Sequence, residues 1–100
     1  MDRFAISATL EARPGKEGEV EEFLKSAQPL AIQEAGTTTW FAFRIGPATF
    51  GIFDTFPNEA GVQAHLSGAI AKALFAKAEE LFAKPPQIQQ LEIFAAKPPS

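Results

Sequence analysis

Four residues have side chains whose type and spacing could support chemistry. His65 is the only histidine of the sequence, and Asp54 precedes it. An imidazole titrates near neutral pH, so His65 suits proton transfer, and a carboxylate such as Asp54 could orient it. Trp40 and Arg44 lie on one face of the same predicted strand, where a guanidinium and an indole ring can pair. These residues predict a site that moves a proton beside an aromatic or anionic group.

Structural roles would also account for the same side chains. His65 lies on or beside the buried stripe of its predicted helix, where it could bond a neighbouring carbonyl or Asp54. Asp54 could instead accept hydrogen bonds from Asn58 or from the backbone amides that begin this helix. The sequence leaves the catalytic and the structural interpretations open.

Composition excludes several other kinds of site. There is no cysteine, which excludes disulfides, thiolate nucleophiles and Cys-ligated zinc. A single histidine leaves any metal site dependent on carboxylates, so we expect none. The net charge of -3 offers no surface for nucleic acid or anionic membranes. For Arg44 the structural alternative is a salt bridge to Glu92 or Glu11, either across the sheet or across a dimer. With no membrane span or signal peptide in the sequence, we expect a cytoplasmic protein.

Hydrophobic periodicity defines the elements that must position these residues. Alternation predicts a strand over 4–12, and 3–4 spacing from about residue 17 predicts a helix that ends at Gly36. Pro29 predicts a kink or a restart near Gln28. Further along the chain, the patterns predict a hairpin whose strands span 37–45 and 49–56. A helix over 58–82, capped by Asn58 and bent at Gly68, follows, and a final strand spans 88–95.

The order β-α-β-β-α-β predicts one α+β domain over residues 1–100 with a ferredoxin-like split βαβ fold. In this fold a four-stranded antiparallel sheet carries both helices on one face. Both faces of the sheet are apolar here. We assign one set to the helix side, namely Phe41, Phe43, Ile45, Phe50, Ile52 and Phe56. The opposite side then carries Trp40, Ala42, Phe53 and Phe94.

If the second face of the sheet were exposed, its apolar patch would be larger than those that monomers usually carry. The simplest cover is the same face of another copy, which predicts a homodimer with two-fold symmetry through the sheet face. The alternative is a monomer with scattered exposed aromatic residues.

The chain resembles the antibiotic biosynthesis monooxygenase-like family of the dimeric α/β barrel superfamily. The resemblance covers nearly all of the sequence and is carried by segments 12–16, 34–36, 53–60 and 64–67. Phe56 stands where family members typically carry Trp, and Ile70 stands where a second His would fall. The resemblance implies a homodimer whose sheets form a barrel, with a small apolar cavity between sheet and helices in each subunit.

The resemblance implies a cofactor-independent monooxygenase that oxidises a small aromatic, quinol-like substrate with dioxygen. In this hypothesis His65 is the base, Asp54 orients it, and Trp40 and Arg44 lie near the developing charge. The substrate would lie among aromatic side chains, Trp40, Phe41, Phe43 and Phe56, and no cofactor is needed. The alternative is a non-catalytic dimer that binds a small apolar or aromatic molecule or serves as a scaffold. The sequence has no tyrosine, so no phenol could relay a proton, which favours the alternative.

Overall fold

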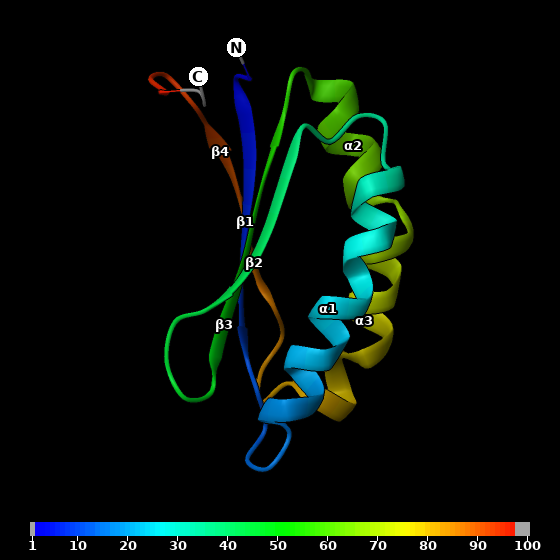
Figure 1. Ribbon diagram of the computed structural model, residues 1–100, viewed down its shortest axis with the longest axis vertical. Helices are drawn as coiled ribbons and strands as arrows, with labels where there is room; N and C mark the ends of the chain where they lie inside the picture. The colour runs from blue at the N-terminus through cyan, green and yellow to red at the C-terminus, as the bar shows by residue number, and fades with distance from the viewer. Residues whose placement is uncertain (1, 98–100) are drawn as a thin grey trace.

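The computed structural model describes residues 2–97 and has two layers, a sheet and a layer of helices (Figure 1). No helix in this range is long and apolar enough to cross a membrane. The elements in chain order are β1 (Phe4–Glu11), α1 (Glu17–Gln33), β2 (Thr39–Arg44), β3 (Thr49–Phe56), α2 (Glu59–Leu66), α3 (Ala69–Leu81) and β4 (Gln87–Glu92).

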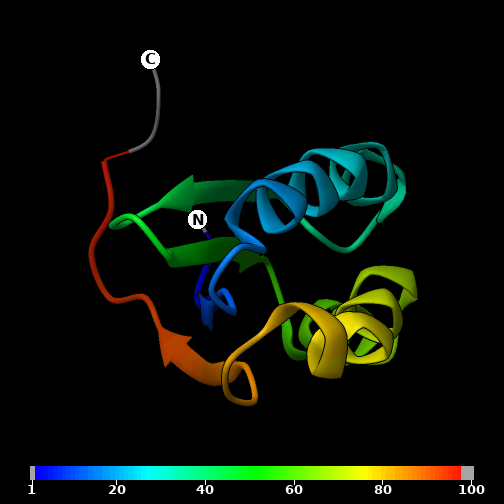
Figure 2. The same ribbon diagram turned by 90° about the horizontal axis from the view of Figure 1, so that it is seen from below.

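The four strands form one antiparallel sheet in the order β2-β3-β1-β4. Both βαβ halves place their helices on the same face of this sheet. Seen from below, α1 lies over the β2–β3 side and α3 lies nearer β4 (Figure 2). This arrangement confirms the predicted ferredoxin-like α+β fold.

A single apolar core joins the two layers. Its largest cluster combines buried side chains from β1, α1, β3 and α3, namely Ala8, Leu10, Ala12, Val20, Leu24, Phe50, Ile52, Leu74, Leu81 and Phe82. The turn from β1 into α1 needs Gly15, whose φ of 86° is a conformation that other residues rarely adopt. The core cluster thus packs α1 and α3 against the central strands β1 and β3.

Two predicted irregularities of the helices had different outcomes. α1 is one uninterrupted helix that contains Pro29, so the predicted restart at Gln28 does not occur. Ala31, beyond the proline, is buried, and its packing holds the last turn in place. In contrast, the second helical segment is divided at Gly68, which caps the start of α3. Asn58 caps α2 as predicted, since its side chain accepts a hydrogen bond of 2.9 Å from the Gly61 amide.

The predicted facing of β2 was wrong. Trp40 pairs with Asp54 and Arg44 pairs with Phe50 in the antiparallel register, so Trp40 and Arg44 face the helices. Phe41 pairs with Phe53 and therefore lies on the open face of the sheet, as does Phe43. Both alternating sets of β2 contain aromatic residues, Trp40 in one and Phe41 and Phe43 in the other, so periodicity alone could not choose between them.

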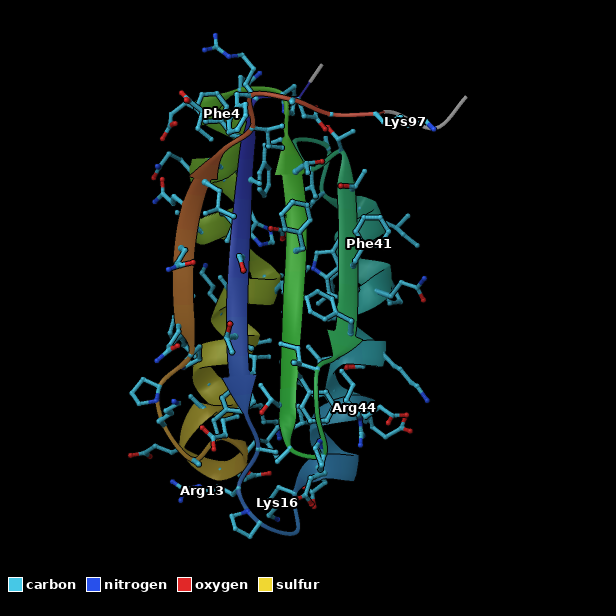
Figure 3. All side chains as sticks on the ribbon, turned by 90° about the vertical axis from the view of Figure 1, so that its left-hand side faces the viewer. Phe4, Arg13, Lys16, Phe41, Arg44 and Lys97 are labelled. Carbon is cyan, nitrogen blue, oxygen red and sulfur yellow. The ribbon has the colours of Figure 1, made fainter. Side chains whose placement is uncertain are left out.

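The open face carries mainly apolar and small uncharged side chains (Figure 3). Phe41 is 58% exposed and Phe43 44% exposed. The Phe43 ring lies over Gly51, where an added Cβ would clash with it. The last strand ends at Glu92 rather than Ala95, so Phe94 lies beyond the sheet and is 88% exposed.

Candidate functional site

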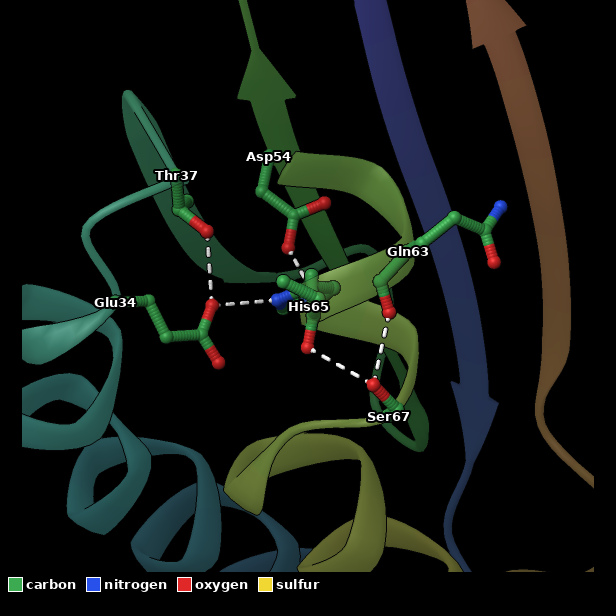
Figure 4. A network of polar contacts seen from close by, with 7 residues as sticks. Glu34, Thr37, Asp54, Gln63, His65 and Ser67 are labelled. Carbon is green, nitrogen blue, oxygen red and sulfur yellow. Dashed lines mark hydrogen bonds and ion pairs between the residues drawn. The ribbon is translucent and has the colours of Figure 1, made fainter. Parts of the chain in front are cut away.

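His65 lies between two carboxylates that come from different elements (Figure 4). Its Nδ1 is 2.7 Å from Oε1 of Glu34, the residue that caps the end of α1, and its Nε2 is 2.9 Å from Oδ2 of Asp54 on β3. Thr37 donates a 2.8 Å hydrogen bond to the same Glu34 oxygen. The imidazole on α2 therefore joins the end of α1 to the centre of the sheet.

Asp54 is an unusual residue in this cluster because it is fully buried. Neither of its oxygens has a well-directed hydrogen bond from residues 2–97, so its contact with His65 is mainly an ion pair. Burying a lone carboxylate is costly, and the neighbouring positive imidazolium offsets that cost. The predicted contact between Asp54 and His65 is present, whereas the alternative partner Asn58 instead bonds Gly61.

The two carboxylates determine the charge of His65. Burial by itself lowers its pKa, but the contacts with Asp54 and then Glu34 raise it to about 9. At neutral pH the ring therefore carries both protons and has no lone pair to accept another. The predicted role of His65 as a base stays a prediction that this geometry does not favour.

The space beside His65 and Asp54 is too small for an aromatic ring. An internal cavity of about 40 Å³ lies between the sheet, α2 and α3, and both polar residues line it. A cavity that holds benzene is about 150 Å³. A second recess of about 230 Å³ reaches His65 from outside but contains no other aromatic side chain. The internal cavity between sheet and helices is therefore smaller than an aromatic ring requires.

A larger groove of about 400 Å³ lies between α1 and the edge strand β2. It brings together four of the five predicted ligand-binding residues, Trp40, Phe41, Phe43 and Arg44. Sequence reasoning did not identify the α1 side of the groove, which Glu21, Leu24, Lys25 and Gln28 provide. The fifth predicted residue, Phe56, is fully buried with its ring 5.3 Å from that of His65 and does not line the groove.

Arg44 has different partners from those considered in the sequence. Its Nη2 is 2.9 Å from Oε1 of Glu21, and its guanidinium lies 4.7 Å from the centre of the Phe50 ring rather than stacking on Trp40. Glu11, one of the expected acidic partners, pairs with Lys84 instead. The indole N–H of Trp40 is buried and has no acceptor in the described part of the chain. Trp40 and Arg44 thus belong to the groove, on the same face but without a mutual pair.

Within residues 2–97, no group of three or more His, Cys, Asp or Glu side chains is arranged to hold a metal ion. Glu34 is the functional residue that sequence reasoning missed, although it was part of the segment that closes the first helix. Its contact with His65 depends on how the loop after α1 packs against α2, and hydrophobic periodicity does not predict this packing. The only available signal was an acidic residue at the end of a helix, where the helix dipole disfavours it.

No protein-family model matches the chain, and no curated protein matches it. Among solved structures, NE2512 from Nitrosomonas europaea, a protein of unknown function, is 53% identical with a TM-score of 0.96 over 100% of this chain and 97% of its own. Rv0793 from Mycobacterium tuberculosis is 15% identical, with a TM-score of 0.83 over 93% of this chain and 96% of its own.

A Deinococcus radiodurans protein that is provisionally named an antibiotic biosynthesis monooxygenase is 18% identical, with a TM-score of 0.80 over 97% of this chain and 98% of its own. At that identity the likeness concerns the fold. The chain belongs to the same family as NE2512, and its fold is that of the antibiotic biosynthesis monooxygenase-like proteins.

Proposed function

We propose that this protein binds a small, flat aromatic molecule in the groove between α1 and β2. The carrying observation is that an aromatic-lined space of about 400 Å³ meets polar groups from both of its walls. Ligand sites commonly combine an apolar lining with a few polar groups that fix orientation. A wider recess of about 610 Å³ between α1 and α3 is lined mostly by charged and small residues and suits a flat ring less well.

Fluorescence can test this proposal directly. Trp40 is the only tryptophan, and there is no tyrosine, so intrinsic fluorescence reports on the groove. Titration with naphthoquinone should quench this emission saturably. Gln28→Phe, an exposed position that fills the groove from the α1 side, should weaken the quenching, whereas the control Gln33→Phe, exposed on the same helix but outside the groove, should not. Quenching that rises without saturation, as it does for free tryptophan, would contradict binding.

Oxidation of the bound molecule is the second candidate function. It is favoured by the fold shared with the Deinococcus protein provisionally named a monooxygenase. For an anthrone-type substrate, a CH₂ group would lose two hydrogens and gain one oxygen atom from dioxygen, and the second oxygen atom would leave as water. A substrate anion donates an electron to dioxygen more readily than the neutral molecule. Arg44 in the groove would stabilise that anion without a dedicated base.

Oxygen consumption with anthrones and hydroquinones, in the presence of a chelator, tests this candidate. We expect protein-dependent uptake that Arg44→Gln lowers and that a folded His65→Gln variant retains. Uptake lost only in the His65 variant would restore the imidazole as the base. Saturable binding without any uptake would leave ligand binding as the function and exclude oxidation of these substrates.

We also propose that a second copy of the chain covers the open face of the sheet. The apolar residues of this face include Ala5, Phe41, Phe43, Phe53 and Leu91. Its other strand residues are uncharged, namely Ser7, Thr9, Thr39, Thr49, Gly51, Thr55, Gln87 and Gln89, apart from Glu11 at one end. An interface with two-fold symmetry opposes each patch to itself, so a surface without central charges avoids like-charge repulsion. The exposed rings of Phe41 and Phe43 provide apolar area for such a contact.

A further inference from the structure

Charged side chains form a network of ion pairs at the groove. Glu21 and Lys25 come from α1 and Arg44 comes from β2. Oε1 of Glu21 is 2.9 Å from Arg44, and its Oε2 is 3.0 Å from Lys25. Both cations lower the pKa of Glu21, Lys25 more than Arg44, so it is ionised at neutral pH. Lys25 is also 3.7 Å from Oε1 of Glu22, so it has two acidic partners, whereas Glu21 is the acidic partner of Arg44 among the described residues.

Arg44 is well placed to bind a second anion. Its guanidinium lies over the Phe50 ring, which also lines the groove, so its plane is held beside the space a ligand would occupy. Besides its contact with Glu21, Arg44 donates a long hydrogen bond of 3.5 Å from Nη1 to the Pro47 carbonyl. Arginine has five N–H donors in a fork that matches a carboxylate. Several of these donors have no acceptor within residues 2–97.

The Glu21–Arg44 ion pair connects the two walls of the groove, since Glu21 lies on α1 and Arg44 ends β2 (Figure 3). Both side chains are more than 40% exposed. Ion pairs with this exposure contribute little, about 0–1 kcal/mol. An incoming anion could therefore replace Glu21 at Arg44 at small cost.

Building on the proposed aromatic site, we propose that the ligand is an aromatic anion whose carboxylate or phenolate binds Arg44 and displaces Glu21. The ring would lie among Leu24, Trp40 and Phe50, and Lys25 would add a second positive charge. Glu21 then acts as a specificity residue, because it occupies the anion position until a ligand of higher affinity arrives.

A matched pair of probes tests this inference: 2-naphthoate, which is an anion at neutral pH, and 2-naphthamide, which is neutral and nearly the same shape. Dissociation constants can be measured from the NMR signal of the single indole N–H. We expect naphthoate to bind about tenfold more tightly, as one charge-assisted contact provides, and the preference to shrink as salt is added.

Variants separate the roles of the two charged residues. Arg44→Gln should remove the preference for naphthoate. Glu21→Gln should increase naphthoate affinity severalfold and leave naphthamide unchanged, whereas the control Glu19→Gln, whose partner is Lys16 outside the groove, should change neither. Equal affinity for the two probes would overturn the inference while leaving the aromatic site intact. If neither probe binds, the proposed function fails. No effect of Glu21→Gln would overturn the displacement.

Discussion

The two carboxylates around His65 make its protonation part of the folding energy. Its pKa rises from 6.5 in the unfolded chain to about 9 in the fold. The folded state therefore binds the proton more tightly, and the resulting stability is fully present below pH 6.5 and lost as pH rises through about 9. The shift corresponds to about 3 kcal/mol. We expect urea denaturation to show the free energy of unfolding falling across this range.

The same titration can be followed at the residue itself, because one histidine gives one imidazole signal by NMR. Its pKa should be about 9 in the native protein and should return toward 6.5 in Asp54→Asn. In His65→Gln the decline of stability with pH should be reduced or absent. A native pKa at or below 6.5 would contradict the ion-pair assignment.

The residues that form the two sites could be predicted from the sequence only in part. Asp54 and His65 could be associated because the turn into the second helix keeps them near in the sequence. Glu34 could not, because it follows the end of α1 and contacts a residue of α2 that is 31 positions away in the sequence. Trp40 and Arg44 were correctly placed together, but their groove depends on α1, whose distance from β2 is set by packing.

At the scale of the elements, α2 lies directly against the loop after α1. A Cβ added to Gly61 would lie 2.5 Å from the Gly36 carbonyl oxygen, so backbone would have to move. Gly61→Ala should therefore destabilise the fold by about 1–3 kcal/mol, as overpacking does. The measurement is the urea midpoint with an unchanged m-value.

Gly18→Ala in α1 is the matched control for this prediction. An added Cβ at Gly18 meets no atom within 4 Å, so the substitution should be neutral or stabilise the protein by up to about 1 kcal/mol through helix propensity. Equal changes in the free energy of unfolding for Gly61→Ala and Gly18→Ala would contradict the prediction that the close contact between Gly61 and Gly36 excludes a Cβ.

The element order was predictable because strands and helices have different hydrophobic periods. The facing of β2 was not predictable, since both of its alternating sets contain aromatic residues and the set that faces the helices includes Arg44. The more hydrophobic set, with Phe41 and Phe43, lies away from the helices. A strand whose outer face is this apolar is consistent with a partner in the assembled molecule.

For the whole molecule, the proposed dimer can be tested with two phenylalanines of similar exposure. Phe41 is 58% exposed on the open face, and Phe75 is 55% exposed on α3. Phe41→Glu should convert the dimer to a monomer in sedimentation velocity, because it places like charges opposite each other, whereas Phe75→Glu should not. A wild-type species of 10.8 kDa at micromolar concentration would contradict the dimer.

The central claim is that ligands enter the α1–β2 groove while His65 serves as a buried ion-pair partner. The most direct measurement is an NMR titration of the native protein with 2-naphthoate that follows the single indole N–H and the single imidazole together. The claim predicts a saturable shift of the Trp40 signal with the His65 signal unchanged. A saturable shift of His65 with Trp40 unchanged would place the ligand between sheet and helices and contradict it.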